Sequence, residues 1–176
     1  FQGMHGAYSD LVCRKYYKDY KTFPCNTFEE TLESVSKNKS DLAMIPVENS
    51  IAGRVSDMHG LLEKTNLKII SEHFNKIEHH LLAKHKSSIK NIKNVYSHIH
   101  ALSQCKKNIR KSKLNPINFI DTAGAAEHVS RSSDYCESAI ASELSARIYD
   151  LKILKKNMQD ETENITRFLV FAKTFK

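Results

Sequence analysis

The sequence predicts an α/β protein made of two lobes. Short apolar runs of strand length alternate with stretches of helical periodicity over nearly all of the 176 residues, which is the pattern of α/β folds. Hydrophobic residues make up 40% of the chain, enough to build a core. The expected division places residues 1–74 and 160–176 in the first lobe and residues 75–159 in the second. The chain would then cross from one lobe to the other twice, leaving a cleft between the lobes along the hinge.

In the first lobe, apolar runs bounded by turn residues predict strands, and apolar residues at helical spacing predict helices. The helix entered at Asn26 and Thr27 has Glu29 and Glu30 in its first turn, where the helix dipole favours acidic side chains. The predicted elements are a strand end at 1–3, a helix at 7–17, a strand at 22–25, the helix entered at 26–27, a strand at 42–47 and an amphipathic helix at 51–62.

The stretch 67–82 is extended and too long for one ordinary strand, so it predicts either a pair of strands or one bent strand. A second group of α/β elements comes next, in which each short apolar strand is followed by a helix. Its elements are strand 94–96, helix 98–111, strand 117–120, helix 123–131, strand 138–141 and helix 142–149. Two closing strands are predicted at 151–156 and 168–173, the second returning to the first lobe.

Composition excludes several classes of protein. No apolar run is long enough to cross a bilayer and no secretory leader is visible, so a soluble, cytoplasmic protein is expected. The four cysteines lie far apart with no Cys-x-x-Cys pair, which favours reduced thiols and argues against a disulfide framework. The histidines lack carboxylates or thiolates at zinc-site spacing, so no metal is expected.

The net charge of +7 is concentrated between His73 and Lys113, where ten Lys or Arg residues accompany only one acidic residue, Glu78. A nucleic-acid surface could have this charge. However, the block contains no Arg-rich motif and no interleaved aromatic residues. We therefore interpret it as a solvated face that attracts anions, and expect no nucleic-acid partner.

Small or hydroxyl residues stand where the predicted strands end and helices begin. These corners are 6–9, 48–50, 97–98 and 121–124. The alternative is that Ser50, Ser97 and Thr122, like Asn26 at another helix start, are ordinary helix N-caps with no further role. Helix N-termini offer unpaired N–H groups to anions, and Arg167 beside Thr166 would add a full positive charge. The residues alone indicate a two-lobed protein that holds a small anionic molecule.

Six ordered segments resemble the prephenate dehydratase family along essentially the whole chain. The most specific are Pro46-Val47-Glu48-Asn49-Ser50 and Thr166-Arg167-Phe168; the others lie at 1–9, 96–105, 121–126 and 139–142, and Asn164 precedes the Thr-Arg-Phe motif. The resemblance implies a fold similar to type II periplasmic binding proteins, with the active site in the cleft. It also implies conversion of prephenate to phenylpyruvate in L-phenylalanine biosynthesis, without a metal or organic cofactor.

The resemblance further implies roles for individual residues. Thr166 would donate a hydrogen bond or proton to the departing hydroxyl, and Arg167 would clamp a carboxylate with its planar fork. The substrate would also be placed by Asn49, Ser50, Ser97, His98 and Thr122, while Phe168 would pack and orient the Thr166–Arg167 pair. A homodimer is expected. Nothing in the chain corresponds to the C-terminal ACT domain through which phenylalanine regulates many relatives.

Three alternatives remain open at this point. Arogenate, which carries an amino group on its side chain, could replace prephenate as substrate. The same cleft could sense or carry an anion without turnover, because a fold does not fix a function. The basic block could bind nucleic acid, which would require binding that weakens steeply with salt.

Overall fold

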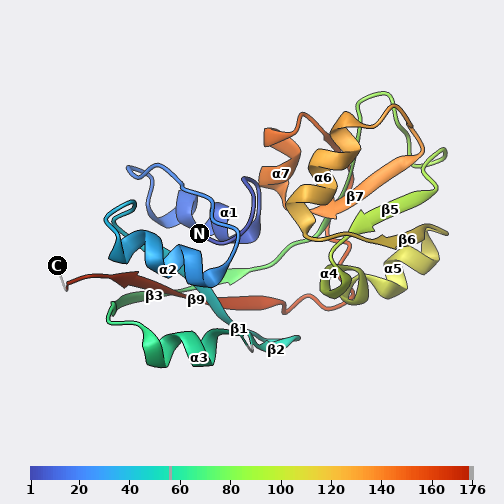
Figure 1. Ribbon diagram of the computed structural model, residues 1–176. Coiled ribbons are helices and arrows are strands. Elements are labelled where there is room, and N and C mark those ends of the chain that lie inside the picture. Colours follow the sequence, from blue (N-terminus) through green and yellow to red (C-terminus); the bar gives the residue numbers. More distant parts are fainter. Residues whose placement is uncertain (56, 175–176) are drawn as a thin grey trace. The chain divides into compact units, whose positions relative to one another are not determined.

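The computed structural model describes residues 1–55 and 57–174, and the chain divides into two compact units. The first unit comprises Phe1–Met4, Tyr8–Ile77 and Glu163–Lys176, and the second comprises His5–Ala7 and Glu78–Thr162. Each unit has its own sheet and helices (Figure 1), so the predicted α/β class is confirmed. The assignment of residue ranges to catalytic lobes stays a prediction.

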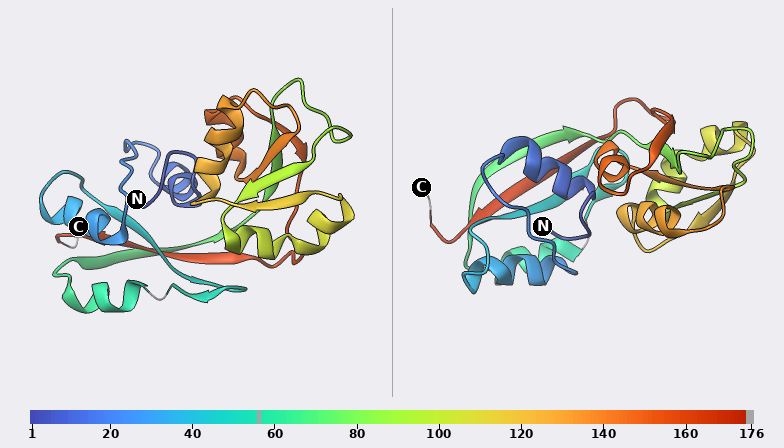
Figure 2. Two further views of the ribbon diagram at one scale, coloured as in Figure 1. Left: turned by 45° about the vertical axis from the view of Figure 1, so that its right-hand side comes forward. Right: turned by 90° about the horizontal axis from the view of Figure 1, so that it is seen from above.

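The first unit contains a four-stranded antiparallel sheet in the order β2-β1-β9-β3. Its elements are α1 (Tyr8–Tyr16), α2 (Phe28–Ser36), β1 (Ala43–Asn49), β2 (Gly53–Arg54), α3 (Asp57–Lys64), β3 (Lys68–Lys76) and β9 (Ile165–Ala172). The strand made last in the chain, β9, lies between β1 and β3 (Figure 2).

Side chains alternate between the two faces of this sheet, and each face has its own apolar cluster. On one face Leu169 and Phe171 of β9 join Leu32 and Val35 of α2 and Met58 of α3. On the other face Phe168 and Val170 of β9 join Met44 of β1 and Val12 of α1. The alternation of buried apolar residues in β9 therefore fixes which face every one of its side chains occupies.

The second unit contains a five-stranded mixed sheet in the order β6-β5-β7-β4-β8. Strand β5 is parallel to both β6 and β7, whereas β4 is antiparallel to β7 and β8. The elements are β4 (His80–Ala83), β5 (Asn94–Ser97), α4 (Ile99–Gln104), α5 (Lys106–Lys111), β6 (Asn115–Asn118), α6 (Thr122–Arg131), β7 (Glu137–Ala141), α7 (Glu143–Ile148) and β8 (Lys152–Lys155).

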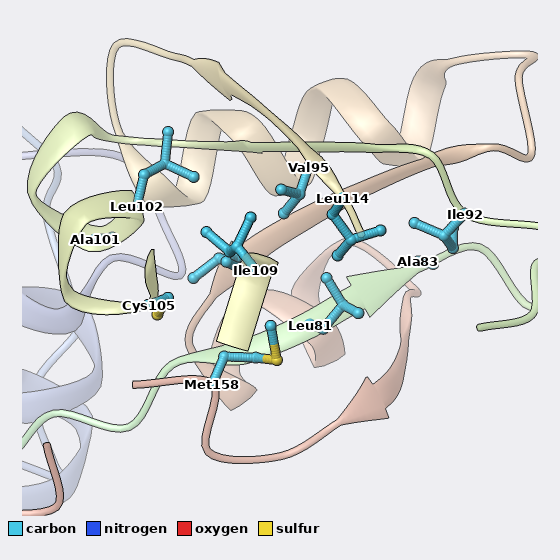
Figure 3. Packing of buried hydrophobic residues seen from close by; sticks show 11 residues of the cluster. Leu81, Ala83, Ile92, Val95, Ala101, Leu102, Cys105, Ile109, Leu114 and Met158 are labelled. Atoms are coloured by element: carbon cyan, nitrogen blue, oxygen red, sulfur yellow. The ribbon is translucent and has the colours of Figure 1, made fainter. Parts of the chain in front are cut away.

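Two apolar clusters form the core of the second unit. One of them gathers Leu81 and Val95 of the sheet with Leu102, Ile109 and Met158 (Figure 3). The other packs α6 and α7 against the sheet through small residues such as Ala125, Ala139 and Ala146. Alanines at these positions let the helices approach the strands closely.

Several predicted elements differ from the structure; the strands predicted at 117–120 and 168–173, for example, are β6 at 115–118 and β9 at 165–172. The region 22–25 forms only an isolated parallel bridge between Gln2 and Cys25. The helix predicted at 51–62 begins later, as α3, because residues 50–52 form the turn between β1 and β2. The single helix predicted at 98–111 is two helices, α4 and α5, that meet at Cys105.

Candidate active site

Thr166 is the second residue of β9 and lies in the middle of a polar row that crosses the sheet. Its register partners are Asn49 on β1 and Asn75 on β3, and directly opposed residues share one face. Thr166 is 8% exposed and Asn75 is 4% exposed. The oxygen Oδ1 of Asn75 accepts a hydrogen bond from Lys15 Nζ at 2.9 Å. The Thr166 hydroxyl is thus nearly buried among amide groups.

Asn49 contacts the Thr166 hydroxyl directly. Its amide nitrogen Nδ2 lies 2.9 Å from Thr166 Oγ1, 2.7 Å from Asn164 Oδ1 and 3.3 Å from the carbonyl oxygen of Ile165. The structure therefore brings together two of the predicted site residues, Asn49 and Thr166, which are 117 positions apart in the chain.

Ser50 uses its hydroxyl to extend the pairing of β1 with β9. Its Oγ donates to the carbonyl of Glu163 at 2.8 Å and accepts from the amide N–H of Ile165 at 2.9 Å. Its own N–H donates to the Ile165 carbonyl at 2.8 Å. The possibility that Ser50 is a helix N-cap is excluded, because the hydroxyl binds the strand that carries Thr166 and no helix begins at residue 51.

Arg167 points to the face of the sheet opposite to that of Thr166, because consecutive strand residues alternate. Its Nε and Nη2 atoms lie 2.8 and 2.7 Å from Oε2 of Glu72 on β3. Glu48 of β1 is the cross-strand partner of Arg167. The Arg167 side chain is 42% exposed. The guanidinium is thus accessible to solvent but already engaged by a carboxylate.

Phe168 returns to the face of Thr166 and is 1% exposed. It packs with Met44, Val12 and Val170 in the core between α1 and the sheet. This packing anchors the strand immediately after the Thr166–Arg167 pair. Sequence reasoning expected Phe168 to pack and to orient these neighbours, and the orienting role stays a prediction.

The other predicted site residues belong to the second unit, at the carboxyl edge of its three parallel strands. Because β5, β6 and β7 run in the same direction, their carboxyl ends share one edge. The helices α4, α6 and α7 start there, with His98, Asp121 and Ser142 as N-caps. The caps are therefore neighbours of the predicted residues Ser97 and Thr122 rather than those residues themselves.

Ser97 is fully buried, and its hydroxyl donates to the carbonyl of Ile140 at 2.6 Å. The Nδ1 atom of His98 accepts from the His100 N–H at 3.4 Å, so the remaining proton of the neutral ring resides on Nε2. Burial, aided by the charge of His100, lowers the pKa of His98, although Asp121 acts in the opposite direction. Thr122 is the first residue of α6. A neutral His98 with an Nε2–H donor is suited to hydrogen-bonding an oxygen.

Two residues that touch predicted site residues were missed by sequence reasoning. Asn164 is fully buried and accepts from Asn49, and Glu72 holds Arg167. Asn164 did belong to the segments that resemble the family, and its place two residues before Thr166 could have drawn attention to it. Glu72 carried no such signal because its pairing depends on strand register.

Neither a metal centre nor a membrane span is found in the part of the chain that the structure describes. Within residues 1–55 and 57–174, no group of three or more His, Cys, Asp or Glu side chains is placed to hold a metal ion. No helix in these same ranges is long and apolar enough to cross a bilayer.

Comparison with known sequences decides the family. A profile described as prephenate dehydratase matches residues 1–176. The chain belongs to the prephenate dehydratase family. A bifunctional N-acyl-homoserine lactone acylase/prephenate dehydratase of Komagataeibacter europaeus is 41% identical over 98% of the chain. An arogenate dehydratase/prephenate dehydratase of Arabidopsis thaliana is 38% identical over 98% of the chain.

Similar solved structures agree that the chain belongs to the prephenate dehydratase family. A structure described as a novel type of quorum-quenching acylase matches all of the chain, with a TM-score of 0.93 and 40% identity, and the match covers 64% of that protein. A prephenate dehydratase from Arthrobacter aurescens in complex with L-Phe gives a TM-score of 0.92 at 25% identity; the match covers all of this chain and 60% of that one. The chain spans 62% of the Komagataeibacter relative and 45% of the Arabidopsis relative.

Proposed function

We propose that this chain converts prephenate to phenylpyruvate, with loss of water and CO2, in L-phenylalanine biosynthesis. Family membership supports the reaction class. The observation that carries the proposal is the Thr166 hydroxyl, nearly buried and bonded through its oxygen to Asn49 Nδ2 at 2.9 Å. This arrangement leaves the hydroxyl hydrogen available to a substrate oxygen.

The chemistry requires little beyond orientation and assistance to the leaving group. The prephenate dianion becomes the phenylpyruvate anion, CO2 and hydroxide: the bond to the carboxylate carbon breaks, its electron pair enters the ring, and the ring C–O bond breaks. A donor aimed at the departing oxygen stabilises the charge that develops on it. In this proposal Thr166 is that donor, because its hydrogen is not used by Asn49.

The remaining predicted roles are proposals about binding. Arg167 would hold a substrate carboxylate, for which its side chain has to leave Glu72 and turn toward the face of the sheet that carries the Thr166 hydroxyl. His98 and Thr122 would contribute donors from the carboxyl edge of the second sheet. Asn49, Ser50 and Ser97 already have hydrogen-bond partners within the protein, and would act on the substrate through the groups that they position.

The deciding experiment incubates the purified chain with prephenate near pH 8, where spontaneous acid-driven loss of CO2 and water is slow, and follows phenylpyruvate by its absorbance in alkali. Thr166→Ala is measured in parallel. Phenylpyruvate from the wild type and not from the variant supports the proposal. No product from a folded wild type contradicts the proposal for residues 1–176.

Two further substrates accompany this assay. Arogenate dehydratase appears in the name of the Arabidopsis relative, so the ratio of kcat/KM for prephenate and arogenate defines the physiological substrate. An N-acyl-homoserine lactone tests whether the second activity named for the Komagataeibacter relative extends to this chain.

Assembly and location complete the proposal. We expect a homodimer in the cytoplasm. The chain has a mass of 20.1 kDa, so light scattering that detects only a species of this mass contradicts the dimer.

A further inference from the structure

The orientation of the Asn49 amide is determined by its neighbours. Its Oδ1 accepts hydrogen bonds from the backbone N–H groups of Ile51 at 3.0 Å and Ala52 at 2.8 Å. A backbone N–H can only donate, so the side-chain atom that faces these two groups has to be the oxygen. The NH2 group of Asn49 is consequently directed toward β9, and the flipped amide would place two donors against two donors.

The NH2 group has two hydrogens, and two side-chain acceptors stand close to it. These are Asn164 Oδ1 at 2.7 Å and Thr166 Oγ1 at 2.9 Å; the Ile165 carbonyl is more distant, at 3.3 Å. An amide nitrogen donates and does not accept. The Thr166 hydroxyl therefore accepts in this contact, and its own hydrogen has to go elsewhere.

The acceptor on Asn164 is fixed in place by the backbone. Asn164 is fully buried, and its carbonyl accepts from the Ile77 N–H at 2.7 Å. Ser50 binds the carbonyl of the preceding residue and the N–H of the following one, at 2.8 and 2.9 Å. The segment just before Thr166 is therefore held on both sides, and the two asparagines meet at a defined position.

We propose that Asn164 and Asn49 are positioning residues that set the direction of the Thr166 hydroxyl. Asn164 engages one hydrogen of the Asn49 amide, Asn49 donates the other to Thr166 Oγ1, and the Thr166 O–H points away as a donor. The last step, donation to the leaving oxygen of the substrate, rests on the proposed dehydratase function. Asn49 thus acts through Thr166, in contrast to the substrate contact that the family resemblance implies.

A double-mutant cycle separates these two roles. Asn49→Asp keeps the shape and removes the donor, so that the Thr166 hydroxyl turns its hydrogen toward the new carboxylate. We expect kcat to fall about 100-fold with KM changed less than about 3-fold, as when a donor to a developing oxyanion is lost. Thr166→Val removes the hydroxyl at nearly constant volume. Adding Asn49→Asp to Thr166→Val should then lower kcat no further, because the group through which Asn49 acts is gone.

One variant controls for the change in charge, and another tests the role of Asn164. Asn115→Asp introduces the same charge change at an exposed position on β6 and should leave kcat unchanged. Asn164→Leu removes the acceptor for the Asn49 amide while keeping the size of the side chain, and should lower kcat about 10-fold at similar KM. Multiplicative losses in the Asn49→Asp, Thr166→Val cycle would overturn the proposal, since Asn49 would then contact the substrate itself.

A measurement without turnover separates this proposal from the proposed function. In the 1H–15N NMR spectrum of the wild-type chain, the Asn49 side-chain amide should give slowly exchanging resonances, one of which shifts in Thr166→Val. A shift in a chain that turns over neither prephenate nor arogenate would refute the dehydratase function and retain the hydrogen-bond assignment. An unshifted, rapidly exchanging Asn49 amide would refute the assignment whatever the activity.

Discussion

Arg167 places two of its nitrogens on a single carboxylate oxygen of Glu72, at 2.8 and 2.7 Å. The pair lies on one face of the four-stranded sheet, and the Thr166 hydroxyl lies on the other. A hydroxyl and a guanidinium that are adjacent in sequence therefore point to opposite faces, and one small substrate can bind both only if the long Arg167 side chain leaves Glu72 and turns toward the face of Thr166. Their contributions to turnover should be separable by mutation.

Replacement of Arg167 should affect KM more than kcat. Arg167→Lys retains the charge and loses the planar fork that could bind a carboxylate through two hydrogen bonds, so we expect KM to rise about 10-fold. Glu72→Gln removes a competitor for the guanidinium and should lower KM. Steady-state kinetics on both variants checks this, and an unchanged KM in both would contradict the clamp. Both side chains are more than 40% exposed, so loss of the pair should cost under about 1 kcal/mol of stability.

Replacement of Thr166 should affect kcat. Thr166→Ala removes the proposed donor and should lower kcat more than about 100-fold at nearly constant KM. Thr166→Ser keeps the hydroxyl and should retain most of the activity, which makes it the matched control. Equal turnover by Thr166→Ala and the wild type would exclude the assigned role.

The stability of the protein should decrease below pH 6.5 because of His79. Burial lowers the pKa of His79 from 6.5 to about 4; His80 acts in the same direction, and the hydrogen bond to Gln104 opposes it. The folded state thus favours the neutral ring. The resulting stability is complete above pH 6.5 and is lost progressively as the pH falls toward 4, by about 3 kcal/mol in total.

Urea unfolding at several pH values measures this loss. His79→Gln should flatten the curve. Some slope should persist in His79→Gln, because burial also lowers the pKa values of His80 and His98. A wild-type free energy of unfolding that is constant between pH 6.5 and 4 would contradict the assignment.

Gly6→Ala should destabilise the second unit. Gly6 has a φ of +94°, and a Cβ placed there would lie 2.7 Å from Ser145 Oγ and 3.1 Å from Ser145 Cα. Its carbonyl also accepts from the hydroxyls of Ser142 and Ser145, at 2.6 and 2.8 Å. We expect a loss of about 2–4 kcal/mol in urea unfolding.

The matched control for this substitution is Gly60→Ala in α3. A Cβ at Gly60 meets no heavy atom within 4 Å apart from its chain neighbours and the backbone of its own helix, and alanine favours the helix by about 0.5–1 kcal/mol. The two alanine substitutions should therefore change the free energy of unfolding in opposite directions. A stable Gly6→Ala variant would mean that the contact with Ser145 relaxes at little cost.

Hydrophobic periodicity predicted the order of most helices and strands. It failed where contacts with a residue distant in sequence determine where a helix ends. The helix predicted at 98–111 breaks at Cys105, although Leu102, Cys105 and Ile109 all join one apolar cluster and maintain the helical pattern. The break is stabilised by Asp160, whose N–H donates to Gln104 and whose carboxylate accepts from the N–H groups of Lys107 and Asn108. No window of sequence around Cys105 contains that partner.

The candidate site likewise contains features that the sequence predicted and features that depend on contacts between distant residues. The resemblance pointed to Asn49 and Thr166, and the structure brings them together. It gave no indication that Asn49 and Ser50 would bind β9: both were expected to place the substrate, and Ser50 was alternatively considered as a helix N-cap. The separation of Thr166 from Arg167 follows from strand alternation and required β9 to begin at Ile165, whereas sequence reasoning placed the start of the strand at residue 168.

The position of β9 between β1 and β3 also has a consequence for biosynthesis. During translation both neighbours are complete long before β9 leaves the ribosome, and until then each lacks its hydrogen-bonding partner on that side. The first sheet consequently cannot close until the segment that carries Thr166 has been made. A nascent or proteolysed chain that ends before Ile165 would expose two unpaired strand edges and lack the proposed donor, so that its catalytic incompetence and its tendency to aggregate would have a common origin.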